Sequence, residues 1–194
     1  ETYNGSIKET GECGYKVNYT LYDDGTLTIE GNGKMYNNAF NSEEYANTIL
    51  KVYIKSGVTS IGNNAFKDCS SLTSVMIPEG VISIGDSAFT RCSSLRGVII
   101  PNGVTSIGKA AFSACSSLTN ITIPDSVTNI SEKTFLECSS LTDITIPNSV
   151  VRIDKAAFSE CSSLINITIP DSVTNISERT FYDCNSLTDI MIPN

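Results

Sequence analysis

The chain has 194 residues, of which 40% are hydrophobic and 18% are charged, and its formal net charge is −8. Binding to nucleic acid or to an anionic membrane requires clustered lysine and arginine residues, and this chain has no such cluster. No apolar run reaches the roughly 18 residues of a membrane span. Histidine, the commonest general base and metal ligand, is absent. We therefore expect a non-enzymatic protein without a cofactor, which neither binds nucleic acid nor inserts into a membrane.

The N-terminal part of the chain carries a β-hairpin pattern. Hydrophobic and polar residues alternate on both sides of the sequence Asp-Asp-Gly at 23–25. A two-residue turn would put Leu21 and Leu27 on opposite faces, whereas a three-residue loop pairs Leu21 with Leu27 and Tyr19 with Ile29 on one face. The longer loop is therefore predicted, with its glycine in the left-handed conformation.

A capping function is predicted for the rest of this part. A short helix is expected to start after Ser42, whose side chain is suited to cap it. The apolar pairs at 35–36 and 39–40 are expected to cover the open end of the repeats that follow, because a stack of repeats needs a cap to stay soluble. Residues 1–48 are thus predicted to be a capping domain of β-hairpin and short helix.

The remaining residues, 49–194, repeat with a step of 23. All six prolines keep this step, as do six of the seven cysteines and six of the seven phenylalanines. The recurring phenylalanines are Phe66, Phe89, Phe112, Phe135, Phe158 and Phe181. Such a register predicts a stack of equal units, about six with a final strand, and excludes a globule built around one pocket.

One unit, residues 72–94, shows how each turn is built. Its inward positions are Leu72, Val75, Ile77, Val81, Ile84, Ala88, Phe89 and Cys92. The first three have the spacing of a leucine-rich-repeat strand, which Pro78 ends because proline cannot donate to the ladder. The last three lie at i, i+1 and i+4, as on a helical turn. The predicted fold is an α/β repeat solenoid, a right-handed horseshoe with short parallel strands on the concave side and short helical turns on the convex side.

Two columns of the repeat contain residue types that also bind metals. The recurring cysteines lack histidine or CxxC partners, so buried free thiols are favoured over zinc sites or disulfides. Acids and amides follow each proline, from Glu79 to Asn194. Such side chains satisfy backbone amides in turns, and calcium binding is the alternative. No metal site is predicted.

At this level of detail the units resemble a known family. The string IPNGVTSIGKAAFSACSSL at 100–118 is similar to the BspA-like (treponemal-type) leucine-rich repeats of bacterial surface proteins, and GECGYKVNYTLYDDGTLTIEGNGKMY at 11–36 resembles the hairpin that often caps such arrays. The resemblance implies secretion to the cell surface and, for some members, adhesion to host matrix proteins or other bacteria. The chain departs from the motif at Ser131, Asp154 and Ser177, which replace glycine, and at Thr134 and Thr180, which replace alanine.

Strand alternation selects a candidate binding face on the concave side. Tyr53, Met76 and Ile99 occupy equivalent outward positions in three successive strands, and Lys51 and Arg96 flank them. Contiguous exposed apolar residues on such a face are typical of a partner site. The predicted partner-binding residues are Lys51, Tyr53, Met76, Arg96, Ile99, Asn120, Thr122, Asp143 and Thr145.

Together these features predict an extracellular protein-binding module that serves in adhesion through its concave face. A structural spacer in a larger surface protein and a carbohydrate-binding module are the alternatives. A monomer is expected, with a dimer through an open strand edge as the second prospect.

Overall fold

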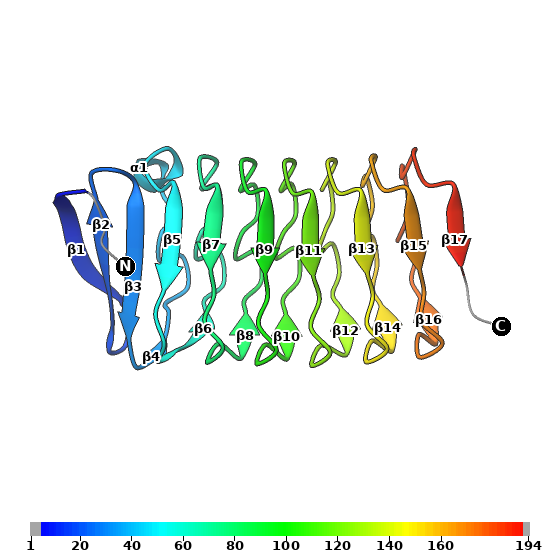
Figure 1. The fold of residues 1–194 in the computed structure, drawn as a ribbon, viewed down its shortest axis with the longest axis horizontal. Coiled ribbons are helices and arrows are strands. Elements are labelled where there is room, and N and C mark those ends of the chain that lie inside the picture. The colour runs from blue at the N-terminus through cyan, green and yellow to red at the C-terminus, as the bar shows by residue number, and fades with distance from the viewer. Residues whose placement is uncertain (1–4, 192–194) are drawn as a thin grey trace.

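The computed structural model describes residues 5–191 and shows a solenoid of parallel-strand turns (Figure 1). Each turn places one longer strand in a row that runs the length of the molecule, and a two-residue strand follows in most turns. The N-terminal strands stand at one end of the row. Among the described residues the single helix has four residues, so no helix there could span a membrane.

The cap is a three-stranded antiparallel meander, formed by β1 (Ile7–Gly14), β2 (Val17–Tyr22) and β3 (Thr26–Gly31). The predicted hairpin is confirmed, since Leu21 pairs with Leu27 and Tyr19 with Ile29, and Gly25 has a φ of +78°. Strand β1 was not predicted. Because β3 also pairs in parallel with the first array strand, the sheet of the cap continues into the array.

Residues between the hairpin and the first array strand close the end of the core. They include β4 (Gly33–Lys34) and α1 (Glu43–Ala46), which starts after Ser42 as predicted, although the Ser42 side chain makes no capping hydrogen bond. Phe40 is fully buried and its ring stacks on Phe66 at 5.4 Å. Met35 is buried too, but Tyr36 is 49% exposed, so the prediction that it covers the core is wrong.

The array contains two sets of strands, and residues 23 apart pair with one another, as Val75 does with Val98. The longer strands are β5 (Lys51–Ile54), β7 (Ser74–Met76), β9 (Gly97–Ile99), β11 (Asn120–Thr122), β13 (Asp143–Thr145), β15 (Asn166–Thr168) and β17 (Asp189–Met191). The second set is β6 (Val58–Ile61), β8 (Ser83–Ile84), β10 (Ser106–Ile107), β12 (Asn129–Ile130), β14 (Arg152–Ile153) and β16 (Asn175–Ile176).

The core consists of columns of identical side chains. From Phe40 to Phe181 the phenylalanine rings stack nearly parallel, with centroids 5.3–6.0 Å apart. Leucine, isoleucine, valine, alanine and cysteine form parallel columns beside them, almost all buried. A single turn could not bury these residues alone, so the stability of each turn depends on its neighbours.

The predicted helical turns are not present. Two residues in each convex segment, such as Ser87 and Arg91, have a left-handed backbone. Ser87 and Phe89 donate their N–H groups to the carbonyls of Lys109 and Ala111 in the next turn, at 2.8 Å. A helix would direct these donors to its own carbonyls four residues back, so cross-turn bonding replaces helix formation.

The predicted horseshoe is not supported either, and the long strands stand in an extended row (Figure 1). A horseshoe forms when bulky convex helices need more room than the strands opposite them. Here the phenylalanine rings, which lie in the core between the strands and the convex segments, have centroids 5.3–6.0 Å apart in successive turns. This is close to the spacing of about 4.8 Å between neighbouring strands, so the convex segments need little extra room. The side predicted to be concave is therefore called the strand face below.

Both sheets are interrupted at the same level of the stack. In residues 5–191 the long sheet ends at β11 and a separate sheet begins at β13, while β10 and β12 belong to different sheets. We call this level the seam. The Phe112 and Phe135 rings, on either side of it, are 6.0 Å apart. The seam coincides with the first replacement of the repeat glycine, by Ser131, whose hydroxyl donates to the carbonyl of Ile107 at 2.7 Å.

Candidate functional site

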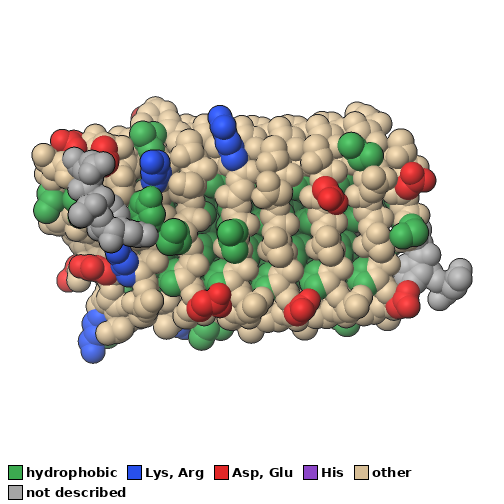
Figure 2. Space-filling model, in the orientation of Figure 1, with side chains coloured by type: hydrophobic (Ala, Val, Ile, Leu, Met, Phe, Trp, Pro, Cys, Tyr) green, Lys and Arg blue, Asp and Glu red, His purple; other side chains and the backbone are tan. Residues whose placement is uncertain are grey.

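The strand face consists of the outward side chains of the seven long strands, β5 to β17 (Figure 2). In β7, β11, β13 and β15 the central residue is buried and both its neighbours are exposed. This alternation follows from strand geometry, since successive side chains point to opposite sides of the sheet. It leaves two columns of outward side chains that take no part in the core.

Three apolar side chains lie side by side on the strand face. Tyr53 pairs directly with Met76, and Met76 with Ile99. Met76 is 54% and Ile99 81% exposed, whereas Tyr53 is half-buried. The structure thus brings together the three residues as expected from the sequence, and we call them the apolar row. Figure 2 shows hydrophobic side chains side by side over this part of the array.

The other predicted residues surround the apolar row or extend away from it along the array. Lys51 lies on β5 and Arg96 directly precedes β9, and both are exposed. Asn120 and Thr122 lie on β11, while Asp143 and Thr145 lie on β13, beyond the seam; all four are exposed. Within the described part of the chain, no ion pair involves Arg96, Asp143 or Asp189. Along the strand face, the basic Lys51 and Arg96 lie on the N-terminal side of β11, and the acidic Asp143 and Asp189 lie on its C-terminal side.

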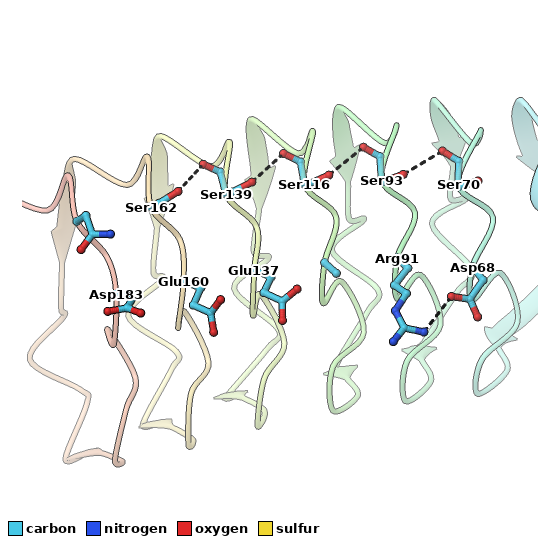
Figure 3. A pocket seen from close by; sticks show the side chains of 12 residues that line it. Asp68, Ser70, Arg91, Ser93, Ser116, Glu137, Ser139, Glu160, Ser162 and Asp183 are labelled. Atoms are coloured by element: carbon cyan, nitrogen blue, oxygen red, sulfur yellow. Dashed lines mark hydrogen bonds and ion pairs between the residues drawn. The ribbon is translucent and has the colours of Figure 1, made fainter.

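Sequence reasoning missed a groove of about 710 Å³ that runs across the turns away from the strands (Figure 3). One of its columns is Asp68, Arg91, Ala114, Glu137, Glu160 and Asp183, and the other is Ser70, Ser93, Ser116, Ser139, Ser162 and Asn185. The recurring serine before each Ser-Leu step was the available signal. Ser93 and Ser162 donate to the carbonyls of Ser70 and Ser139 at 3.4 Å. These hydroxyls therefore tie successive turns together.

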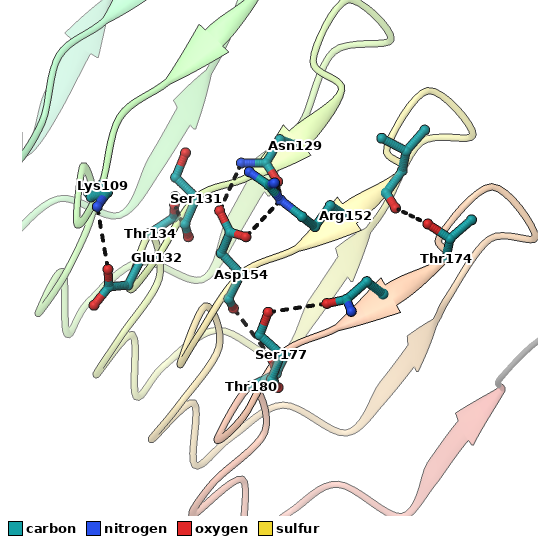
Figure 4. Close-up of polar contacts among 12 residues, drawn as sticks. Lys109, Asn129, Ser131, Glu132, Thr134, Arg152, Asp154, Thr174, Ser177 and Thr180 are labelled. Atoms are coloured by element: carbon teal, nitrogen blue, oxygen red, sulfur yellow. Dashed lines mark hydrogen bonds and ion pairs between the residues drawn. The ribbon is translucent and has the colours of Figure 1, made fainter.

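A polar cluster near the seam also joins neighbouring turns (Figure 4). Asn129 donates from Nδ2 to Oδ2 of Asp154 at 3.1 Å, and Arg152 Nε lies 2.8 Å from Asp154 Oδ1. Where serine replaces the repeat glycine, threonine replaces the repeat alanine, and Thr134 donates to the carbonyl of Ser131 at 2.8 Å. These side chains are hydrogen-bonded to one another or to backbone carbonyls, so they form structural contacts and not an open site.

The recurring cysteines are free thiols, as predicted, and all except Cys184 are buried. Each donates to the carbonyl of a phenylalanine in the preceding turn, as Cys115 does to Phe89 at 3.2 Å. Burial raises the pKa of these thiols, to about 12 for Cys69. Among residues 5–191 no three histidine, cysteine, aspartate or glutamate side chains are grouped as metal ligands.

Alkaline pH is expected to destabilise the fold through these thiols. Burial raises the pKa of Cys13 and Cys69 from 9.0 to about 12. Between pH 9.0 and about pH 12 these thiols lose their protons in the unfolded chain but keep them in the folded chain. The free energy of unfolding should therefore fall as the pH rises through this range. Urea unfolding at stepped pH measures the slope. A Cys69→Ala variant should show a shallower slope, and a slope equal to that of the parent chain would contradict this origin.

Comparison with known proteins gives the same fold. The chain resembles the crystal structure of a Treponema pallidum leucine-rich repeat protein, with a TM-score of 0.72, 26% identity, and coverage of 88% of this chain and 87% of that one. A Bacteroides ovatus leucine-rich repeat protein gives 0.51 and 24%, with coverage of 99% and 66%. The pneumococcal vaccine antigen PcpA gives 0.58 and 19%, with coverage of 91% and 46%. No curated protein sequence matches the chain.

The family is shown by the repeats themselves. The model for the BspA type leucine rich repeat region matches residues 33–139 and 86–194, with six copies. These matches extend from the end of the cap to the last residue and cover well over half of the 194 residues. The chain belongs to the BspA-type leucine-rich repeat family.

Proposed function

We propose that the chain is an extracellular protein-binding module, and that it serves in cell-surface adhesion to host matrix proteins or other bacteria through the strand face. The apolar row carries this proposal. Its three side chains lie on adjacent strands, and two of them are more than half exposed. Water-exposed apolar neighbours give a protein partner surface to bury.

The surroundings of the row resemble a protein interface. Lys51 and Arg96 flank it, and both are exposed to solvent. Protein interfaces commonly have an apolar centre surrounded by polar and charged groups, and most of the binding energy comes from a few central residues. We therefore expect Tyr53, Met76 and Ile99 to contribute most of the affinity, and the two basic residues to affect the rate of association.

The groove is a weaker candidate than the strand face. Its serine hydroxyls are engaged in cross-turn hydrogen bonds, and Arg91 is paired with Asp68 at 3.3 Å. Met76 and Ile99, by contrast, are apolar and mostly exposed, so a partner can bury them without breaking such bonds. A carbohydrate partner is also less favoured, because Tyr53 is the single aromatic residue among the outward positions of the long strands.

Binding to immobilised matrix proteins and to bacterial cells tests the proposal. The double variant Tyr53→Asp/Met76→Asp should lose at least about tenfold in affinity, because carboxylates replace central apolar contacts. The matched control is Ile82→Asp/Val151→Asp, which changes two residues that are 54% and 50% exposed outside the strand face. The control should bind as the parent chain does.

Each outcome has a definite meaning, provided that circular dichroism shows both variants folded. Selective loss in the strand-face variant supports the proposal. Equal binding by the parent chain and both variants would show that the partner binds outside the apolar row. The absence of binding by any form would favour the spacer function.

A further inference from the structure

We propose that one partner of the strand face is the strand face of a second copy of the chain, with the two arrays running in opposite directions. This inference rests on the proposed function, because it uses the same face. It would make the adhesion homophilic, between cells that carry the same protein. The inference comes from the order of side chains along the face.

The geometry is a two-fold rotation about an axis parallel to the strands. Such a rotation turns the second copy to face the first and reverses the order of its strands. With β11 opposite β11, strand β5 faces β17, β7 faces β15, and β9 faces β13. Symmetric dimers require a surface that is complementary to itself in this way.

The charges on the long strands match under this rotation. Lys51 faces Asp189 of the second copy, and Arg96, next to β9, faces the strand that carries Asp143. The two-fold axis repeats both contacts, so each dimer gains four opposite-charge contacts from two pairs. The remaining residues in this column are uncharged, and Asn120 faces its own equivalent. The pair on β5 and β17 and the pair at β9 and β13 are both symmetric about β11, so both place the two-fold axis at this strand.

The apolar row also meets suitable side chains. Tyr53 faces Met191, which is 65% exposed. Met76 and Ile99 face Thr168 and Thr145, whose methyl groups can pack against them. The second outward column therefore combines apolar with amphipathic residues and places no charge against an apolar group.

The other face-to-face arrangement is electrostatically unfavourable. A two-fold axis along the array would place each strand opposite its own equivalent. With this axis between the two outward columns, Lys51 would face Tyr53, Asp143 would face Thr145, and Asp189 would face Met191. Charged groups would then lie against uncharged or apolar side chains with no opposite charge to meet, so the charge pattern favours the reversed arrangement.

The extended row makes contact along the whole face feasible, but the face is small. Seven strands cover about 30 Å by about 10 Å, below the area of about 800 Å² per partner in standard interfaces. Acidic residues in the turns beyond the strands, Glu79, Asp125 and Asp171, add repulsion at the rim. We therefore expect weak association, with a dissociation constant on the order of 0.1 mM.

Two charge-reversed variants test the pairing by sedimentation equilibrium up to about 1 mM, since weak dimers of this size need such concentrations. Variant one is Lys51→Asp/Arg96→Asp, and variant two is Asp143→Lys/Asp189→Lys. Each should self-associate at least about tenfold more weakly than the parent chain, because like charges then face one another. Their equimolar mixture should form a heterodimer with an affinity close to that of the parent dimer.

A second pair of variants controls for net charge alone. Lys34→Asp/Lys133→Asp and Glu137→Lys/Glu160→Lys change exposed residues away from the strand face by the same charges. Each should self-associate with the affinity of the parent chain, and their equimolar mixture should associate no more tightly than either variant alone. Equal heterodimer formation by the control mixture would overturn the inference.

Two further results would also overturn it: a parent chain that stays monomeric, or strand-face variants that still dimerise. The proposed function is tested separately. If self-association fails while Tyr53→Asp/Met76→Asp abolishes binding to matrix proteins or other bacteria, the strand face binds a different protein and only the homophilic inference falls.

Discussion

Replacement of Phe112 by alanine should lower the free energy of unfolding by about 3–5 kcal/mol. The Phe112 ring is fully buried and stacks between Phe89 at 5.4 Å and Phe135 at 6.0 Å. Alanine would leave a cavity in the middle of the column. The neighbouring turns cannot readily close this cavity, because cross-turn hydrogen bonds hold the backbone on both sides, including the bond from Phe112 N–H to Thr134.

Urea unfolding and the melting temperature measure this loss. Phe181→Ala is the matched control, because its ring is only partly buried and stacks on Phe158 alone among the described rings. The control should lose less stability than Phe112→Ala. An unchanged melting temperature for Phe112→Ala would contradict the stacked core.

Gly108→Ala should clearly destabilise the fold, although it adds only a methyl group. A β-carbon at Gly108 would lie 2.5 Å from the backbone nitrogen of Asp86 and 2.6 Å from the carbonyl carbon of Gly85. Backbone atoms of the preceding turn cannot rotate away as a side chain can. Two turns would have to move apart, at an expected cost of about 1–3 kcal/mol.

Gly80→Ala is the control for this prediction. A β-carbon there would meet only the Val58 carbonyl oxygen at 3.8 Å, an ordinary contact. Its stability should stay within about 0.5 kcal/mol of the parent chain. Equal stability for the two variants in urea unfolding would show that close approach of the turns is not needed at Gly108.

The period of 23 allowed much of the fold to be predicted. It identified the stack, the columns of core residues and the pairing of residues such as Val75 and Val98. Side-chain alternation was sufficient to predict the hairpin register, because a shift of one residue would have reversed the faces of Leu21 and Leu27. These features depend on local periodicity, which a single sequence displays directly.

Features that depend on contacts between turns were predicted poorly. The spacing of Ala88, Phe89 and Cys92 fits a helical turn as well as it fits the non-helical segment that is present. The two are distinguished by cross-turn hydrogen bonds, such as the one from the Phe89 N–H to the Ala111 carbonyl. The close spacing of the turns on the side opposite the strands depends on those same bonds. Strand β1 has no strong alternation, and the groove forms from side chains in several turns.

The strand-face residues were located correctly, but their function stays a prediction. Alternation places Tyr53, Met76 and Ile99 together, and the strand pairing confirms this. The sequence shows which side chains a solenoid leaves outside its core. Which molecule meets them depends on complementarity with a second surface.

The seam has a mechanical consequence for a protein that would connect two bodies. In the described residues neither sheet crosses this level, so the turns on either side are joined by the convex backbone bonds and by side-chain contacts such as Cys138 to Phe112. Stability in a repeat array is a sum over such interfaces. Under tension applied to its two ends, the array would extend first at this level, and each half would remain wound.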